Sequence, residues 1–304
     1  MKVSTLSKEA FDYALATNGL SIKTGPFVSR IQSPLPAVQN NVYKLYYDHE
    51  IDDTGFADFP VSIQHPKSPR RWYRPQILFR FNGTAPFKPL PESQAYPALE
   101  WGLNWTIAMH AHQFLVIHAA VVAKGNHAVI LPGSPGAGKS TLCAGLISRG
   151  WRLLSDELTL ISTRERKVHP LVRPINLKND SIGIIRDFNP DAVFSDKFVD
   201  TLKGTVALVK PPVESVTASE LVADPIAVVF PKYVSEAATE ITEFSKARTT
   251  LELAEQTFNF GVLGEHAFNV ITDMVDDCAC LKFEYSDLDD GIRTLHSLVA
   301  NASI

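Results

Sequence analysis

Residues 133 to 140 read Gly133-Ser134-Pro135-Gly136-Ala137-Gly138-Lys139-Ser140, which fits the phosphate-binding pattern GxxxxGK(S/T). The glycines let backbone N–H groups turn toward phosphate oxygens, while Lys139 reaches the β- and γ-phosphates and the Ser140 hydroxyl ligates Mg²⁺. The apolar run 128–131 predicts a buried strand before the loop, and 141–149 predicts a short helix after it. Because a helix N-terminus favours an anion, the stretch predicts that the chain binds a nucleotide. The predicted contacts are Gly133, Ser134, Pro135, Gly136, Ala137, Gly138, Lys139, Ser140 and Thr141.

Length and composition limit the class of protein. With 304 residues and 45% hydrophobic content, the chain can bury a large core, as one big domain or two. A net charge of −4 argues against nucleic acid as the main partner. No run of about 18 apolar residues could span a bilayer, and the first residues lack a signal-peptide core. We therefore expect no membrane partner. Since the 3 cysteines are few and odd in number, we expect the protein to be cytoplasmic.

Residues 1–112 predict a mixed α/β module. Aromatic and alternating stretches predict strands at 42–47, 61–65 and 76–81. A proline-rich connection follows at 86–91, and a helix is expected over 96–112. Its two tryptophans, Trp101 and Trp105, are expected to belong to the core rather than to a base-stacking platform.

Residues 113–304 predict an α/β catalytic domain that carries the phosphate loop. Strand 114–122, a turn at 124–126 and strand 128–131 form the expected hairpin into the loop. Further strands are expected at 152–155, 158–162, 205–209 and 226–230, and helices at 246–258 and 286–300, the last with an N-cap at Ser286.

Two adjacent acids, Asp156 and Glu157, follow the strand expected at 152–155. The spacing from Lys139 fits one helix, a turn and a returning strand. Ligands of open α/β sheets bind beyond the carboxyl ends of the strands, so both carboxylates are expected close to the phosphates. One can hold Mg²⁺ and the other can accept a proton from an attacking hydroxyl. The spacing alone leaves open an acidic turn between two strands.

Histidines and cysteines offer further candidates. His118 lies inside an apolar strand before the loop, where a core histidine and a catalytic group are both open readings. The pair His110 and His112 is a poor metal site, because residues two apart on a helix point to different sides. Cys278 and Cys280 have no second Cys or His pair nearby, so we expect them to be buried small hydrophobes.

Taken in order, these features resemble the HPr kinase/phosphorylase family. A histidine on a strand before the loop is matched by His118 in the stretch 117–121, and the loop itself by 133–140. An Arg-Gly-x-Arg-Leu stretch that ends in two acids is matched by 149–157. Further stretches resemble the subgroup called HPr kinase-related kinase A, at 86–91, 173–178, 203–207 and 258–264.

The resemblance implies a kinase that uses ATP and Mg²⁺ to phosphorylate a serine hydroxyl on a peptide or small protein. Lys139 and Ser140 would hold phosphates and metal, with Asp156 as the second metal ligand. The family's proton acceptor falls at Glu157, where the family has Asp, so either Glu157 or Asp156 is the expected base. His118 would position or polarise the acid and phosphate groups. Relatives of this type assemble into oligomers, so self-association is expected.

One stretch departs from the family. Its Glu-, Arg- and Gly-rich stretch for dephosphorylation has no match in 171–178, so a phosphorylase reaction and a second metal-binding Glu stay unassigned. Arg173 and Lys178 could instead neutralise the transferring phosphate. Two other functions stay open: a nucleotide-binding regulatory protein with weak or no catalysis, and a kinase of a small hydroxylated metabolite.

Overall fold

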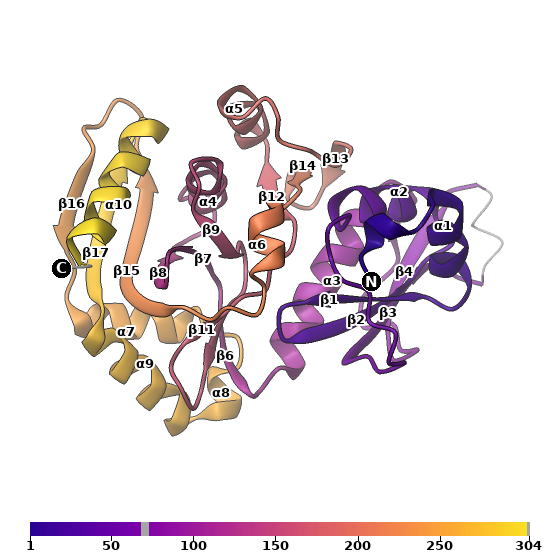
Figure 1. Cartoon of the computed structure of the whole chain (residues 1–304), viewed down its shortest axis with the longest axis horizontal. Helices are drawn as coiled ribbons and strands as arrows, with labels where there is room; N and C mark the ends of the chain where they lie inside the picture. Colours follow the sequence, from indigo (N-terminus) through magenta and orange to yellow (C-terminus); the bar gives the residue numbers. More distant parts are fainter. Residues whose placement is uncertain (68–72, 303–304) are drawn as a thin grey trace.

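A computed structural model describes residues 1–67 and 73–302 and has the predicted α/β fold (Figure 1). We call residues 1–112 the N-terminal part and residues 113–302 the C-terminal part. Helix α3 lies on the side of the N-terminal part that faces the C-terminal part (Figure 1).

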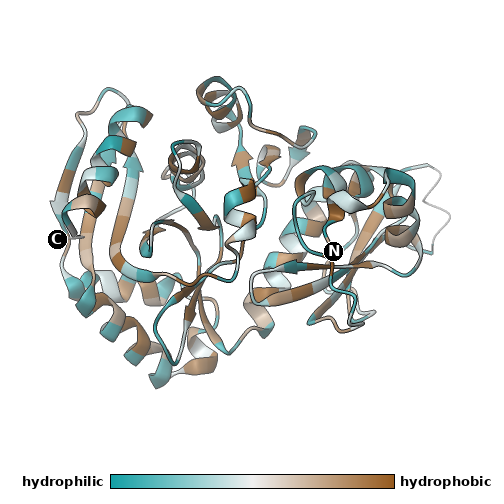
Figure 2. Ribbon diagram, in the orientation of Figure 1, coloured by the Kyte–Doolittle hydropathy of each residue, from teal (hydrophilic) through white to brown (hydrophobic). Residues whose placement is uncertain are grey.

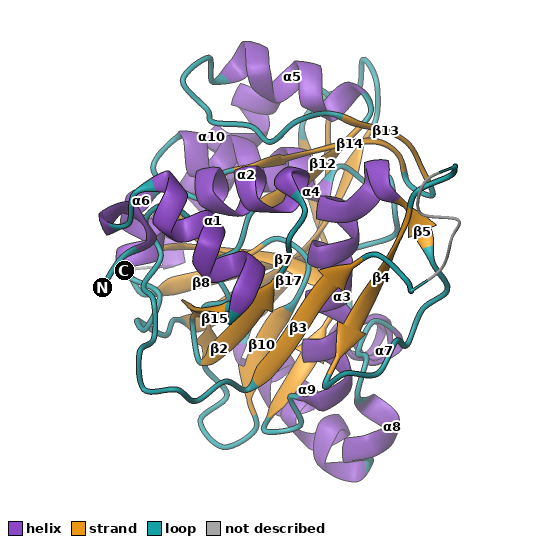
Figure 3. Cartoon of the chain, turned by 90° about the vertical axis from the view of Figure 1, so that its right-hand side faces the viewer, coloured by secondary structure: helices purple, strands orange, loops and turns teal. Residues whose placement is uncertain are grey.

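The N-terminal part is one sheet covered by helices. In the described chain the strand order is β1-β2-β3-β4-β5, with β2 and β3 parallel and the other pairs antiparallel. Alternate residues of β2 and β3 are buried, so one face of the sheet meets the helices (Figure 3). The elements are η1 Val3–Thr5, α1 Lys8–Thr17, β1 Leu20–Thr24, β2 Phe27–Gln32, α2 Pro36–Leu45, β3 Phe59–Gln64, β4 Gln76–Phe81, β5 Leu90–Pro91, η3 Glu92–Gln94 and α3 Ala95–His110.

The strand predicted at 42–47 is wrong, because those residues belong largely to helix α2. Pro36 starts this helix with a backbone angle already suited to it. Val38, Val42 and Leu45 recur at helical spacing and are all buried, so helical periodicity outweighs the local run of aromatic residues. The strands predicted at 61–65 and 76–81 are confirmed as β3 and β4.

A mixed sheet carries the C-terminal part, in the order β16-β17-β15-β8-β7-β9. Strands β17, β15 and β8 are parallel, and β7 is antiparallel to both β8 and β9. Alternate residues of β7 and β8 enter two different hydrophobic clusters, one under α4 and α10 and one under α7 and α9. Helices therefore cover both faces, which explains the continuous apolar runs in these strands (Figure 2). The elements are β7 Ala119–Lys124, β8 His127–Pro132, α4 Lys139–Ser148, β9 Arg152–Ser155, β15 Asp224–Tyr233, β16 Glu240–Glu243, α7 Lys246–Glu255, α8 Phe260–Leu263, α9 Glu265–Asp277, β17 Ala279–Tyr285 and α10 Leu288–Ala302.

Two small sheets join the two parts. One has the order β11-β10-β6 and the other the order β12-β14-β13. Phe198, Val206 and Leu208 of the second sheet pack in the same hydrophobic cluster as α1, α2 and α3. The apolar core therefore continues across residue 112. The elements are β6 Phe114–Ile117, β10 Thr159–Ser162, β11 Val168–His169, β12 Ile175–Lys178, α5 Asp180–Phe188, β13 Phe198–Thr201, β14 Gly204–Val209 and α6 Val213–Thr217.

The strand predicted at 114–122 is interrupted at His118. Its first half, β6, pairs with β10, while its second half, β7, enters the large sheet. The His118 N–H donates to the Gln256 carbonyl at 2.8 Å, so the backbone leaves one sheet and joins another at this residue. Apolar pattern alone cannot reveal such a change, because both halves are buried.

Other predicted ends shift by small amounts. The N-cap predicted at Ser286 is wrong, because Asp287 Oδ1 accepts the Asp290 N–H at 2.8 Å, while the Ser286 hydroxyl donates to the Ala237 carbonyl. The helix predicted over 246–258 ends at Glu255. In the described residues, no helix is long and apolar enough to cross a membrane. Cys278 and Cys280 are buried, as predicted.

His49 joins the two parts and makes stability depend on pH. It is 2% exposed, and its Nε2 lies 2.9 Å from the Val172 carbonyl. Burial lowers its pKa to about 4, although Asp48 beside it favours the charged form and Lys210 opposes it. The unfolded chain therefore binds a proton on this residue between pH 6.5 and 4 that the folded chain does not, and stability falls as the pH falls through this range.

We expect acidification from pH 7 to pH 5 to destabilise the protein through His49 by about 2 kcal/mol. His49→Gln keeps a donor for Val172 but does not titrate. Chemical denaturation of both proteins at the two pH values gives the contribution of His49 as the difference between them. Asp156, whose pKa is raised, stabilises both proteins equally as the pH falls, so its contribution cancels. A stability difference between the two proteins that does not change with pH would contradict the expectation.

Candidate active site

The topology brings three predicted features to one edge of the large sheet. The phosphate loop follows the carboxyl end of β8, and Asp156 follows the carboxyl end of β9. Strand β7 lies between β8 and β9 and runs the opposite way, so its beginning, next to His118, lies at the same edge. The sequence prediction that these residues converge beyond strand ends therefore has a simple geometric cause.

The phosphate loop has the backbone that its glycines allow. Gly133, Gly136 and Gly138 have φ angles of 146°, 88° and 94°, which side-chain-bearing residues rarely adopt. Helix α4 begins at Lys139, so its unpaired N–H groups face the space in front of the loop. Lys139 Nζ donates to the carbonyls of Gly133 and Ser134, the second at 3.1 Å, which holds the ammonium over the loop.

Tyr285, on strand β17, packs closely against the loop at Gly138. A Cβ at Gly138 would lie 2.8 Å from the Tyr285 hydroxyl oxygen, whereas a Cβ at Gly136 would meet no described atom within 4 Å. The Tyr285 hydroxyl also lies 3.4 Å from the Gly138 carbonyl. Gly138 is therefore required by its φ angle and by this close approach.

We expect Gly138→Ala to weaken ATP binding by about tenfold, because it strains the backbone and displaces Tyr285 or the loop. Gly136→Ala is the matched control: it carries similar backbone strain without the clash, and should weaken binding by about threefold. Calorimetric titration with ATP and Mg²⁺ measures both. Equal effects of the two substitutions would show that the Tyr285 contact is irrelevant.

Asp156 is buried directly behind the loop. It is 6% exposed, and its Oδ2 accepts the Asn176 N–H at 2.9 Å. Its Oδ1 has no hydrogen-bond partner among the described residues. Burial and then the neighbouring Glu157 charge raise its pKa to about 7, against the Asn176 N–H, the Ser140 hydroxyl and the Lys178 charge. A cation or a proton on this carboxylate would remove a substantial cost.

The neighbouring acid, Glu157, has more polar partners than Asp156. Asn104 Nδ2 donates to Oε2, and Asn176 Nδ2 donates to Oε1 at 3.3 Å. Lys203 Nζ lies 3.8 Å from Oε1. Burial would raise the pKa of Glu157, but the positive charges of Lys203, Lys178 and other neighbours outweigh it and lower the pKa. Glu157 is therefore ionised at neutral pH, whereas the pKa of Asp156 lies close to neutral pH.

His118 lies at the same cavity on the junction between β6 and β7. Burial, followed by the charge of Lys139, lowers its pKa, so the ring is neutral at neutral pH. Its ring packs edge-on against Phe258. Gln256 accepts the His118 N–H through its carbonyl, and its side-chain oxygen accepts the Gly133 N–H at 3.0 Å. One residue thus ties His118 to the start of the phosphate loop.

A cavity of about 640 Å³ joins these residues, a size typical of sites for small ligands. The described lining residues are His118, Pro135, Gly136, Gly138, Lys139, Ser140, Thr141, Asp156, Glu157, Asn176, Lys178, Asn179, Ser181 and Lys203. Of the predicted nucleotide contacts, Gly133, Ser134 and Ala137 lie in the loop outside this lining. The Thr141 hydroxyl donates to Ser181 at 2.8 Å, which ties α4 to the start of α5.

The residues present fit a magnesium ion. Ser140 and Asp156 both line the cavity, and the unpartnered Asp156 Oδ1 offers a hard oxygen ligand. Among the described residues, no group of three or more His, Cys, Asp or Glu side chains could hold a metal by itself. Mg²⁺ in nucleotide sites needs one or two protein oxygens, because phosphates and waters complete its shell.

Arg173 corrects one expectation from the sequence. It is 7% exposed and pairs with Glu100 at 2.5 Å, so it does not neutralise a phosphate in the cavity. Lys178, on the same stretch, does line the cavity. Sequence reasoning also missed Asn104 and Asn176 as partners of Glu157. They come from α3 and β12, and no spacing in the sequence links them to the paired acids.

No protein-family model matches the chain, and no curated protein matches it. Among solved structures, the chain is similar to the Hpr(Ser) kinase/phosphatase from Coxiella burnetii, with a TM-score of 0.29 and 12% sequence identity. The match covers 62% of this chain and 95% of the other chain. We therefore base the functional proposal on the arrangement of the site residues.

Proposed function

We propose that this protein is an ATP- and Mg²⁺-dependent kinase that transfers the γ-phosphate to a hydroxyl of a peptide or small protein. One observation carries the proposal: the phosphate loop, two adjacent acids and a histidine all line one cavity. Nucleotide binding alone needs the loop but not two acids. In this proposal residues 113–304 form the catalytic domain, and residues 1–112 form an N-terminal module that shares its apolar core with that domain.

The loop side of the cavity holds the phosphates. Backbone N–H groups at the start of α4 and the Lys139 ammonium face the β- and γ-phosphates. Ser140 and Asp156 would hold Mg²⁺, which would neutralise charge on the phosphate oxygens when bound. Lys178, at the end of β12, adds positive charge to the lining of the cavity. Phosphoryl transfer depends mainly on this positioning and charge stabilisation.

The acid side of the cavity serves the acceptor. Asp156, with its unpartnered oxygen, suits the metal, which leaves Glu157 to accept the proton of the attacking hydroxyl. Glu157 is ionised and held by two side-chain amides, so an acceptor hydroxyl meets an oriented carboxylate. His118 is neutral and can exchange a hydrogen bond with the acid or the phosphate without adding charge.

Labelled ATP tests the proposal. The protein, or its Lys139→Ala variant, is incubated with γ-³²P-ATP, Mg²⁺ and a cell lysate, and the products are separated by size. A labelled band that only the unsubstituted protein produces supports the kinase. Label in the small-molecule fraction would instead identify a metabolite kinase. ATP binding without any transferred label would identify a nucleotide-binding regulator and overturn the proposal.

A further inference from the structure

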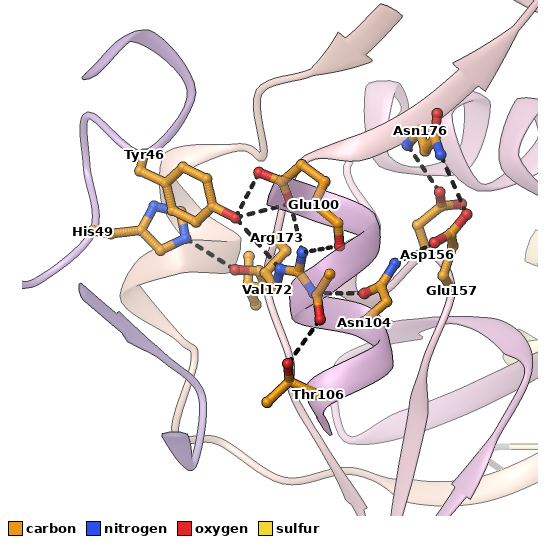
Figure 4. Close-up of polar contacts among 11 residues, drawn as sticks. Tyr46, His49, Glu100, Asn104, Thr106, Asp156, Glu157, Val172, Arg173 and Asn176 are labelled. Atoms are coloured by element: carbon orange, nitrogen blue, oxygen red, sulfur yellow. Dashed lines mark hydrogen bonds and ion pairs between the residues drawn. The ribbon is translucent and has the colours of Figure 1, made fainter. Parts of the chain in front are cut away.

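A buried chain of polar contacts leads from the N-terminal part to the paired acids (Figure 4). Tyr46 of the segment after α2 donates to Glu100 of α3 at 3.0 Å. Arg173 Nη2 donates to Glu100 at 2.5 Å, and its Nη1 donates to Asn104 Oδ1 at 2.5 Å. Asn104 Nδ2 then donates to Glu157 Oε2. The chain thus ends on the carboxylate that the proposed function assigns as the base.

Asn104 is suited to this place by the two ends of its amide. A guanidinium carries only donors and an ionised carboxylate only acceptors. The amide oxygen must therefore face Arg173 and the amide nitrogen must face Glu157, which fixes the orientation of the group. No other side chain of this size offers an acceptor on one side and a donor on the other.

The groups behind Asn104 are held firmly. Arg173 and Glu100 are 7% and 3% exposed, and breaking a buried pair of this kind leaves an uncompensated charge. Helix α3 itself packs closely on β4, because a Cβ at Gly102 would lie 2.2 Å from the ring of Phe79. The position of Asn104, half a turn further along α3, is therefore fixed by the packing of this helix.

The orientation of the Glu157 carboxylate depends on its contact with Asn104. Its other oxygen, Oε1, has the longer contacts, 3.3 Å to Asn176 and 3.8 Å to Lys203, and the Lys203 side chain is 41% exposed. Asn104 Nδ2 donates to Oε2, whereas Lys203 pairs with Oε1. Without the Asn104 contact, the carboxylate could rotate toward Lys203 and away from the acceptor hydroxyl.

We propose that Asn104 is a positioning residue for Glu157, so that helix α3 of the N-terminal part completes the active site of the C-terminal part. The Arg173–Glu100 pair orients Asn104, and Asn104 orients the carboxylate. The catalytic effect of Asn104 rests on the proposed function. The contact between Asn104 and Glu157 is independent of that function.

The test replaces Asn104 with leucine, which has a similar shape but no amide. We expect kcat for phosphate transfer to fall by about 10²-fold, with the ATP dissociation constant changed by less than about twofold. Thr106→Val, about half a turn further along α3, is the matched control. It loses a hydrogen bond to the Gly102 carbonyl but touches neither acid, and its kcat should stay within about twofold of the unsubstituted value.

A second variant keeps the inference testable if leucine disturbs folding. Asn104→Asp retains the partner for Arg173 but turns an acceptor toward Glu157, and should also lose most of kcat while it stays folded. In a Glu157→Gln background, Asn104→Leu should change the residual rate by less than about twofold, because the group that it positions is gone. Full turnover by both Asn104 variants, or equal losses of kcat and ATP affinity, would overturn the inference.

An activity-independent measurement separates the two proposals. Unfolding of the single and double variants at Asn104 and Glu157 should show a coupling of at least about threefold in the folding equilibrium constant. If the unsubstituted protein transfers no phosphate, the proposed function fails and this coupling still tests the contact. Additive effects on unfolding would contradict the contact, whatever the activity.

Discussion

Lys139→Ala is expected to reduce phosphate transfer by at least about 10³-fold, the largest single effect in this protein. The Lys139 ammonium lies over the phosphate loop, where it contacts the carbonyls of Gly133 and Ser134. In the proposed function, it is the fixed positive charge on the transferring phosphate. Its loss removes one fixed positive charge from the negative charge that develops in a partly buried site. Initial rates of transfer from labelled ATP measure the effect.

A control variant and an unfolding measurement show whether the loss of activity is specific to Lys139. Lys167→Ala, which removes a lysine paired with Asp224 away from the cavity, should transfer phosphate at an unchanged rate. Lys139→Ala should also unfold at nearly the same denaturant concentration, because its side chain bonds only the loop's own carbonyls among the described residues. A variant that retained a tenth or more of the activity would contradict the proposed role of Lys139.

Glu157→Gln carries the second large expected effect. We expect kcat to fall by about 10²- to 10⁴-fold, because glutamine cannot accept the proton of the attacking hydroxyl. The ATP dissociation constant should change by less than about threefold, since Glu157 lies on the acceptor side of the cavity. Steady-state kinetics together with calorimetric titration separate the two quantities. Glu165→Gln, an exposed acid in the turn after β10, should leave both unchanged.

The neighbouring acid sharpens this test. Asp156→Asn removes the proposed metal ligand, so it should raise the Mg²⁺ concentration needed for half-maximal transfer, whereas Glu157→Gln should not. The opposite pattern, with metal dependence moved by Glu157→Gln and not by Asp156→Asn, would exchange the two roles. Full activity in both variants would exclude the paired acids from the reaction.

Local sequence patterns predicted the strand–loop–helix unit at the centre of the site. Each of its signals lies within a few residues of the feature that it specifies: glycines where φ is positive, an apolar run where both faces of a strand are covered, and a helix where the loop ends. The same local reasoning failed at 42–47, where aromatic residues suggested a strand. There, the helical spacing of residues buried under α3 decides the structure.

Contacts between distant segments lay outside such reasoning. Arg173 looked like a phosphate ligand because it is a cation in a stretch that also carries Lys178. In the structure, the Arg173 guanidinium pairs with Glu100, which lies on a helix far away in the sequence. Asn104 and Asn176 carry no signal of their own, since asparagines occur throughout the chain. Only their placement beside Glu157 marks them.

By itself, the sequence determined the phosphate loop, the paired acids, the histidine and most of the strands near them, because these follow from residue type and short-range spacing. Only the tertiary structure decided how the two acids differ and which residues hold them. Burial and the neighbouring Glu157 charge raise the pKa of Asp156, while the positive charges of Lys203 and Lys178 outweigh burial and lower the pKa of Glu157. Such differences depend on solvent exclusion and on charges brought together by folding, which no local pattern encodes.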